Sequence, residues 1–148
     1  TNADSNSVSA GYYDAFLIKY DSSGNKQWTK QLGTSGSDIG RSVTIDTNDN
    51  IYLTGETGGS LDGNTLIGGL DVFLIKYNSS GTKQWTKQFG TTSTDRGVSV
   101  ATDNSLAVYV TGETSGGLEG NSHSGYTTCG GTCPDMFLIK FNSDGDLQ

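Results

Sequence analysis

The chain repeats itself with a period of 57 residues. Residues 14–57 align with residues 71–114 without a gap, and 27 of these 44 positions are identical. A third copy begins at Asp135, which is 64 residues after Asp71, and it reaches Gln148, one position before the next tryptophan of the pattern. Self-similarity at this period predicts a repeat architecture in which each unit is one supersecondary element. We therefore expect the 148 residues to be a piece of a longer array.

Each unit holds four short segments that are rich in β-branched and aromatic residues and bounded by Gly, Asn, Asp and Ser. The expected strands are 41–46 and 98–103 (first), 51–57 and 108–114 (second), 14–20, 71–77 and 135–141 (third), and 26–32 and 83–89 (fourth). Tight turns at 21–25, 47–50 and 78–82 join strands that follow one another. Consecutive antiparallel strands with such turns form a four-stranded meander, the blade of a β-propeller.

The predicted fold is therefore all-β, with about two and a half blades of a larger propeller or assembly. Residues 1–33 would be the end of one blade, with its third and fourth strands. Residues 34–90 would be a complete blade, and residues 91–148 an incomplete one with strands one to three. A closed ring takes about four to eight blades and removes exposed sheet edges. Either more sequence completes the ring, or copies of the chain cover one another's edges.

The charge and the apolar pattern exclude two classes of partner. The net charge is −7, and the few basic residues are spread along the strands, whereas nucleic-acid binding needs clustered Lys and Arg. No apolar run approaches the roughly 20 residues that a membrane-spanning helix requires. We expect neither nucleic-acid binding nor membrane insertion in this segment.

Several recurring motifs resemble a known family. They include Asp14–Tyr20 and its copies, the step from Gly24 to Trp28, the Asp38-x-Gly40 motif and the segment Asn50–Thr57. As a set they resemble the bacterial β-propeller repeats labelled SBBP. The resemblance implies secreted or cell-surface bacterial proteins with repeats strung in arrays, mostly without an assigned activity, and it carries over no catalytic residue.

The glycine-to-tryptophan step is also similar to quinone-dependent dehydrogenase propellers and their outer-membrane assembly relatives. In those families the tryptophan docks between blades, which is the role we expect for Trp28 and Trp85. A quinone site would need a cofactor-stacking surface and a carboxylate centre that binds calcium, and no motif here identifies either. The resemblance therefore implies a packing role and no cofactor.

The two cysteines, Cys129 and Cys133, lie close together in a long loop. A local disulfide is the first interpretation, and it would imply an oxidising compartment. Two free thiols, or part of a metal site with His123, are the alternatives. The spacing differs from that of zinc knuckles, and His123 is the one histidine available.

Oxygen-bearing side chains in the turn after the first strand suggest a weak calcium candidate. Asp46, Asn48 and Asp49 alternate along the turn, and oxygen-rich loops bind hard cations. The counterpart turn at 103–107 has lost this pattern, although a structural site should recur with the blade. Ordinary turn chemistry is the competing explanation.

Charged residues that recur in every unit are expected to be structural, because an active site is usually singular. The repeated lysines could pair with glutamate or aspartate within or between blades, and the repeated aspartates before x-Gly are expected to accept hydrogen bonds from loops. These residues are Lys19, Lys76, Lys140, Glu56, Glu113, Asp38 and Asp95.

The long loops, 58–70 and 115–134, are the places where a ligand would bind. They leave the same end of the meander as 33–40 and 90–97, and length variation at one end is how repeat proteins display recognition surfaces. Tyr12, Tyr13, His123 and Tyr126 are the candidate binding residues there. Catalysis through His123 is the less favoured interpretation, because no Gly-x-Ser-x-Gly elbow is present.

The sequence thus predicts a non-enzymatic, extracellular or cell-surface scaffold, an adhesive module or a building block of a surface assembly. A propeller that binds carbohydrate or protein on its long-loop face is the alternative, and a fragment of a propeller enzyme is the third hypothesis. The expected partners are further blades or identical copies, and a surface glycan or protein in the alternative.

Overall fold

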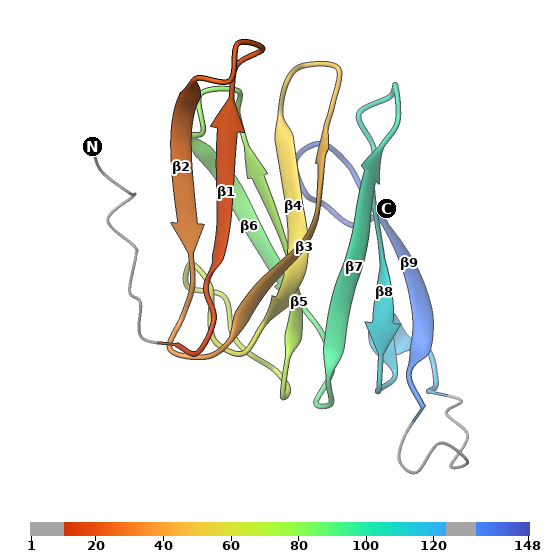
Figure 1. The fold of residues 1–148 in the computed structure, drawn as a ribbon. Helices are drawn as coiled ribbons and strands as arrows, with labels where there is room; N and C mark the ends of the chain where they lie inside the picture. Colours follow the sequence, from red (N-terminus) through yellow and green to blue (C-terminus); the bar gives the residue numbers. More distant parts are fainter. Residues whose placement is uncertain (1–10, 124–132) are drawn as a thin grey trace.

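The computed structural model describes residues 11–123 and 133–148, whose nine strands form three antiparallel sheets (Figure 1). We call these sheets blades 1, 2 and 3. Blade 1 contains β1 (Ala15–Tyr20) and β2 (Lys26–Leu32). Blade 2 contains β3 (Asp38–Ile45), β4 (Ile51–Thr57), β5 (Asp71–Tyr77) and β6 (Lys83–Phe89), and blade 3 contains β7 (Asp95–Thr102), β8 (Val108–Thr114) and β9 (Asp135–Phe141).

The strand order follows the chain in every blade, as a meander requires. The predicted all-β fold, built from antiparallel meanders, is confirmed. Within the described residues, the one helical segment is the short 3₁₀ turn η1 (Leu118–Gly120), and no helix is long and apolar enough to cross a membrane.

The first strands of blades 2 and 3, β3 and β7, begin three residues earlier than the sequence predicted. Asp38 pairs with Thr57, and Asp95 pairs with Thr114, so pairing continues through the glycines that follow each aspartate. A register shift lies between Gly40 and Ser42 in one blade and between Gly97 and Ser99 in the other. Each glycine therefore sits beside a β-bulge inside a strand, where the prediction had placed a loop.

The core consists of two layers, one on each face of β5. Phe73, Ile75 and Tyr77 cluster with Ala15 and Leu32 of blade 1. The alternate side chains of β5, Val72 and Leu74, cluster with residues of blade 3. Because successive strand residues point to opposite faces, a strand buried on both faces reads as a continuous apolar run.

The two ends of the blades differ in their connections. Tight turns lie at one end, uppermost in Figure 1, and the longer connections 33–37, 58–70 and 90–94 lie at the other. We call these the turn end and the loop end. Residues 115–123, which follow β8, also belong to the loop end (Figure 1).

Close approach between blades 2 and 3 depends on Gly97. A Cβ atom at this position would lie 2.6 Å from Thr54 Oγ1 and 2.9 Å from Val72 Cγ1. At the equivalent position of blade 2, a Cβ atom on Gly40 would come no closer than 3.4 Å to Ala15 Cβ. The same repeat position is therefore sterically restricted at one interface and ordinary at the other.

Gly97→Ala is expected to lower the free energy of unfolding by about 1–3 kcal/mol, because the added methyl group overpacks the interface. Gly40→Ala is the matched control and should change it by less than about 0.5 kcal/mol. Urea unfolding of both variants measures the difference. Equal destabilisation by the two substitutions would show that the interface does not set the requirement at Gly97.

Candidate functional site

Blade 1 contacts blade 2 through a lysine and a tryptophan that converge on one carbonyl oxygen. Lys19 and Trp28 are paired across β1 and β2. Lys19 Nζ donates to the Ser79 carbonyl at 2.9 Å, and Trp28 Nε1 donates to the same oxygen at 3.4 Å. Ser79 belongs to the turn between β5 and β6, so the contact joins the strands of one blade to the turn of the next.

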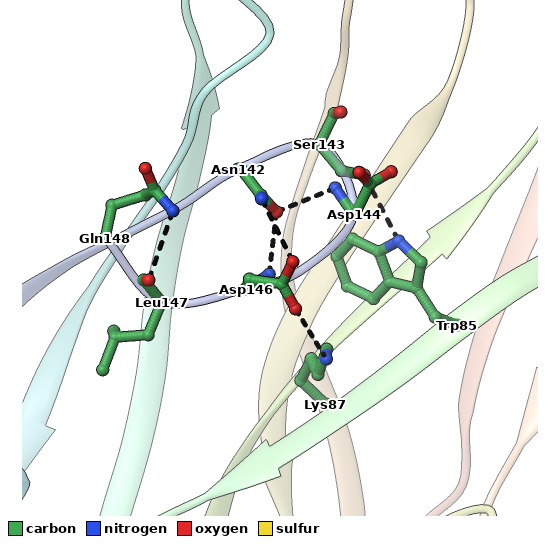
Figure 2. A network of polar contacts seen from close by, with 8 residues as sticks. All are labelled: Trp85, Lys87, Asn142, Ser143, Asp144, Asp146, Leu147 and Gln148. Carbon is green, nitrogen blue, oxygen red and sulfur yellow. Dashed lines mark hydrogen bonds and ion pairs between the residues drawn. The ribbon is translucent and has the colours of Figure 1, made fainter.

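The same contact recurs between blades 2 and 3. Lys76 and Trp85 are paired across β5 and β6, and both donate to the Ser143 carbonyl, at 2.8 and 3.3 Å. Figure 2 shows the Trp85 indole against the turn 142–146, with Lys87 4.0 Å from the Asp146 carboxylate. We call this arrangement of Lys, Trp and turn carbonyl the blade latch.

Glycine in the turn gives the indole ring room to approach. Gly81 and Gly145 have φ of 78° and 82°, a left-handed conformation that glycine adopts without strain. A Cβ atom on Gly81 would lie 2.9 Å from the Trp28 ring, and one on Gly145 would lie 3.2 Å from the Trp85 ring. The structure thus places Trp28 and Trp85 between blades.

The expected pairing of repeated lysines with repeated glutamates is wrong for Lys19, Lys76 and Glu56. Both lysines donate to turn carbonyls, and Lys76 also lies 5.4 Å from the centre of the Tyr52 ring. Register explains the difference: Lys76 pairs with Tyr52 at one end of β4, whereas Glu56 pairs with Val72 near the other end. Four residues of extended chain separate the two charges.

Glu56 binds arginine instead of lysine. Its carboxylate is buried, and it accepts from Arg41 Nε at 3.0 Å and from Arg41 Nη2 at 2.6 Å. Arg96 of blade 3 approaches the same carboxylate at 3.8 Å. Hydrogen bonding to Glu56, its charge and that of Glu113 raise the pKa of Arg41. The third repeated lysine, Lys140, also lies against an aromatic ring: its Nζ is 5.6 Å from the centre of the Tyr109 ring.

Asp38 and Asp95 are buried at the loop end, where each binds the loop that precedes its strand. Asp38 accepts from the Thr34 amide at 2.5 Å and from the Thr34 hydroxyl at 3.0 Å. Asp95 accepts from the Thr91 amide at 2.6 Å and from the Thr91 hydroxyl at 2.9 Å. Thr57 Oγ1 also donates to Asp38. These contacts pair the amide and hydroxyl donors of two partly buried loop threonines, as local side-chain hydrogen bonds commonly do.

The Asp46 carboxylate organises the turn between β3 and β4. It accepts hydrogen bonds from the Asn48 and Asn50 amides at 2.8 and 2.9 Å, from Asn50 Nδ2 at 2.9 Å and from the Tyr52 hydroxyl at 3.1 Å. The Asp49 backbone has φ of 62°, and its counterpart Leu106 has φ of 64°. In blade 3, Asp103 accepts from the Ser105 and Ala107 amides at 2.8 and 2.9 Å and from the Tyr109 hydroxyl at 3.0 Å, so the turn keeps its shape although Leu106 stands where Asp49 stands in blade 2.

No group of three or more His, Cys, Asp or Glu side chains within residues 11–123 and 133–148 could hold a metal ion. The calcium site at Asp46, Asn48 and Asp49 stays a prediction. Tyr126 and Cys129 lie outside the described residues, so the disulfide to Cys133 also stays a prediction. His123 Nε2 lies 2.9 Å from the Cys133 carbonyl oxygen, which joins the two ends of this loop.

Tyr12 and Tyr13 project from the loop end. Their side chains are 91% and 67% exposed, while the Tyr13 carbonyl accepts from the Asp38 amide at 2.8 Å. Tyr13 also forms a parallel bridge with Ser37. The backbone here is held by blade 2, and the two aromatic rings remain available to solvent.

Two stretches of the chain, residues 27–62 and 84–119, match the family model described as "Beta-propeller repeat", which bears the label SBBP. The chain carries SBBP repeats. Each matched stretch begins in the fourth strand of one blade and ends in the long loop after the second strand of the next. The SBBP sequence unit is therefore offset from the structural blade: each matched stretch contains the tryptophan of one blade latch, Trp28 or Trp85, and the first two strands of the next blade.

Two curated proteins are similar to the chain. An "Uncharacterized WD repeat-containing protein" of Acanthamoeba polyphaga mimivirus is 27% identical over 124 residues, which cover 72% of this chain and 9% of that protein. The "Regulatory protein FlaEY" of Caulobacter vibrioides is 29% identical over 149 residues, which cover 93% of this chain and 15% of that protein. The chain thus spans only a small part of each relative.

One recurring motif of these SBBP repeats escaped the sequence analysis. Leu61-Asp62-Gly63-Asn64 returns 57 residues later as Leu118-Glu119-Gly120-Asn121, with the same period as the strands. Leu61 and Leu118 are buried, although both lie in the long loops that were predicted to form the ligand-binding surface. Extending the gapless alignment past Thr57 would have revealed the motif.

Asp46 is expected to make the stability of the chain depend on pH. Burial raises its pKa, but the hydrogen bonds from Asn50, Asn48 and Tyr52 outweigh burial and leave the pKa below the ordinary value of 3.8. The ionised carboxylate therefore stabilises the fold above pH 3.8, and this contribution is lost as the pH falls through the lower folded pKa.

Asp46→Asn should cost about 1–3 kcal/mol at pH 7 and reduce the loss of stability in acid. Urea unfolding at a series of pH values measures both effects. Asp49→Asn, in the same turn, is the control and should leave the pH profile unchanged. If wild type and Asp46→Asn lose stability in parallel as the pH falls, Asp46 has no such role.

Proposed function

We propose that the chain is a non-enzymatic structural segment of an extracellular or cell-surface bacterial protein, in which SBBP blades stack into a scaffold or surface assembly. One observation carries the proposal: the outward faces of blades 1 and 3 repeat the two faces that blade 2 buries. The membership of the repeats in the SBBP family supports a repeat array, and one similar protein comes from a bacterium.

The outward face of blade 1 matches a face that is covered elsewhere. Phe73, Ile75 and Tyr77 of β5 are at most 3% exposed, because blade 1 covers them. Their counterparts in β1 are Phe16, Ile18 and Tyr20, which are 67%, 36% and 55% exposed. Gly24, the counterpart of Gly81, has φ of 81° and no atom within 4 Å of a Cβ position. This face is ready to receive the Lys and Trp of another blade.

The outward face of blade 3 supplies the other half of the same interface. Val72 and Leu74 are fully buried against blade 3, whereas their counterparts Met136 and Leu138 are 87% and 66% exposed. Burying such a side chain fully is worth about 1.5–3 kcal/mol. We infer that further blades of the same repeat, from a longer chain or from identical copies, cover both faces.

The isolated 148-residue chain is expected to self-associate through these faces. Phe16→Asp should weaken association at least about tenfold, because it places a charge in the apolar contact. Sedimentation velocity over a range of concentrations measures the effect. The proposal predicts no change for Ile67→Asp, a loop residue that is 51% exposed.

Two results would contradict this proposal. One is a chain that stays monomeric at every concentration and unfolds cooperatively. The other is equal weakening of association by Phe16→Asp and Ile67→Asp, which would point to a general effect of charge and not to the outward face of blade 1.

Exposed aromatic residues support a second candidate function, the binding of a carbohydrate or protein at the loop end. Tyr12 and Tyr13 stand side by side on a backbone held by blade 2, and exposed aromatic rings offer flat apolar surfaces for contact. The other long connection, 115–134, contains His123 and also the candidate residues Tyr126, Cys129 and Cys133. The ligand site would then be an addition to the scaffold.

Under this second function, the chain should bind at least one member of a panel of bacterial surface glycans, and Tyr12→Ala with Tyr13→Ala should weaken that binding at least about tenfold. Tyr20→Ala is the control, because Tyr20 is 55% exposed and lies at the turn end. Glycan-array binding followed by calorimetry measures the effect. Binding that Tyr20→Ala weakens equally would exclude a site at the loop end.

A further inference from the structure

The motif Leu61-Asp62-Gly63-Asn64 anchors the long loop of blade 2 against the outermost strand, β6. The Leu61 side chain is 2% exposed, and its amide donates to Gln88 Oε1 at 2.9 Å. Asn64 donates to the Leu61 carbonyl through its backbone and its side chain, both at 2.8 Å. Asp62 and Gly63 have φ of 51° and 81°, which turns the Asp62 carboxylate toward the strand. The buried leucine and these hydrogen bonds thus hold the middle of the loop against β6.

This loop forms hydrogen bonds or ion pairs with three side chains of β6: Lys83, Thr86 and Gln88. Asp62 accepts from Lys83 Nζ at 2.5 Å and from the Thr86 hydroxyl. Gln88 Nε2 donates to the Gly59 carbonyl at 3.1 Å and to Asp71 Oδ2 at 3.0 Å. Gln88 therefore serves as donor and acceptor at once. A strand without Thr and Gln two residues apart would leave these partners unsatisfied.

Blade 3 contains the same loop motif. Asn121 donates to the Leu118 carbonyl at 3.0 Å from its backbone and at 3.1 Å from its side chain. Glu119 and Gly120 have φ of 51° and 79°, as in blade 2. Leu118 is buried, and Glu119 stands where Asp62 stands in blade 2. Blade 3 therefore contains the same contacts within its loop as the loop that holds β6 in blade 2.

A groove of about 680 Å³ lies beside β9, where β6 lies in blade 2. Gly116, Leu118, Glu119 and Asp135 line it, and these are the counterparts of the four residues that contact β6: Gly59, Leu61, Asp62 and Asp71. Leu147 bridges to Phe141, as Lys83 pairs with Tyr77, so Leu147 and Gln148 hold the first two positions of an outer strand. The rest of the groove continues along β9.

We propose that this groove binds an extended strand with the pattern Trp-Thr-x-Gln-aromatic, added antiparallel to β9. Its threonine hydroxyl donates to Glu119. Its glutamine accepts from the Leu118 amide and donates to the Gly116 carbonyl and Asp135, while its tryptophan packs beside Lys140. The inference rests on the proposed scaffold function and names what the scaffold recognises: the side-chain pattern of an outer strand, beyond general apolar contact.

The test uses the whole chain and a peptide with the sequence of residues 85–91, Trp-Thr-Lys-Gln-Phe-Gly-Thr, acetylated and amidated. Titration of the ¹⁵N-labelled chain by NMR should shift the Leu118 amide and the amides of β9. A peptide with leucine in place of glutamine should bind at least about tenfold more weakly, because three hydrogen bonds are lost. Valine in place of the peptide threonine should weaken binding about threefold or more.

A variant of the chain provides the reciprocal control. Glu119→Ala should weaken the binding of the peptide that contains threonine and leave the affinity for the valine peptide unchanged, because only the threonine hydroxyl donates to Glu119. Equal affinity of all peptides, or shifts confined to the edges of β2 and β6, would overturn the proposal. If the peptide fails to bind while Phe16→Asp still suppresses association, the inference fails and the scaffold function stands. If the peptide binds but association is unaffected by Phe16→Asp, the scaffold function fails instead.

Discussion

The third strand of each blade must bury both of its faces, and the rest of the structure depends on this requirement. β5 meets it because Phe73 and Ile75 face blade 1 while Val72 and Leu74 face blade 3. A single sheet can cover neither face, so each blade is stable through its neighbours, as in other repeat proteins. The same strand sequence therefore gives a buried core in blade 2 and exposed apolar faces in blades 1 and 3.

Apolar burial alone does not fix how one blade sits on the next, because it is not directional. The blade latch supplies direction: Lys76 and Trp85 converge on the Ser143 carbonyl, and Gly145 gives the indole room. Buried polar atoms need partners, so a displaced blade would lose both hydrogen bonds. This explains why lysine, tryptophan and the turn glycine recur together along the chain.

Strand pairing could be predicted from the sequence because its determinants are local. The bounds of β4, β5, β6, β8 and β9 follow from apolar runs and turn residues. The partner of Glu56 could not be predicted, because Arg41 reaches it from a bulge and Arg96 from another blade. The role of Leu61 was missed for a different reason: its signal is a repeat inside a loop, and the alignment of the repeats ended at Thr57.

The two ends of the blades have different freedom to vary. At the turn end, the carbonyl of Ser79 or Ser143 is already occupied by the neighbouring blade, so a change of turn length would break a latch. At the loop end, Asp38 binds Thr34 at the start of its connection, the motif at Leu61 holds the middle of the loop 58–70, and Asp71 accepts from the Ile67 and Gly68 amides near the end of that loop. The side chains of Thr65 and Ile67, which lie between these contacts, are exposed. A scaffold of this kind can therefore acquire a binding site at its loop end without losing the contacts that join its blades.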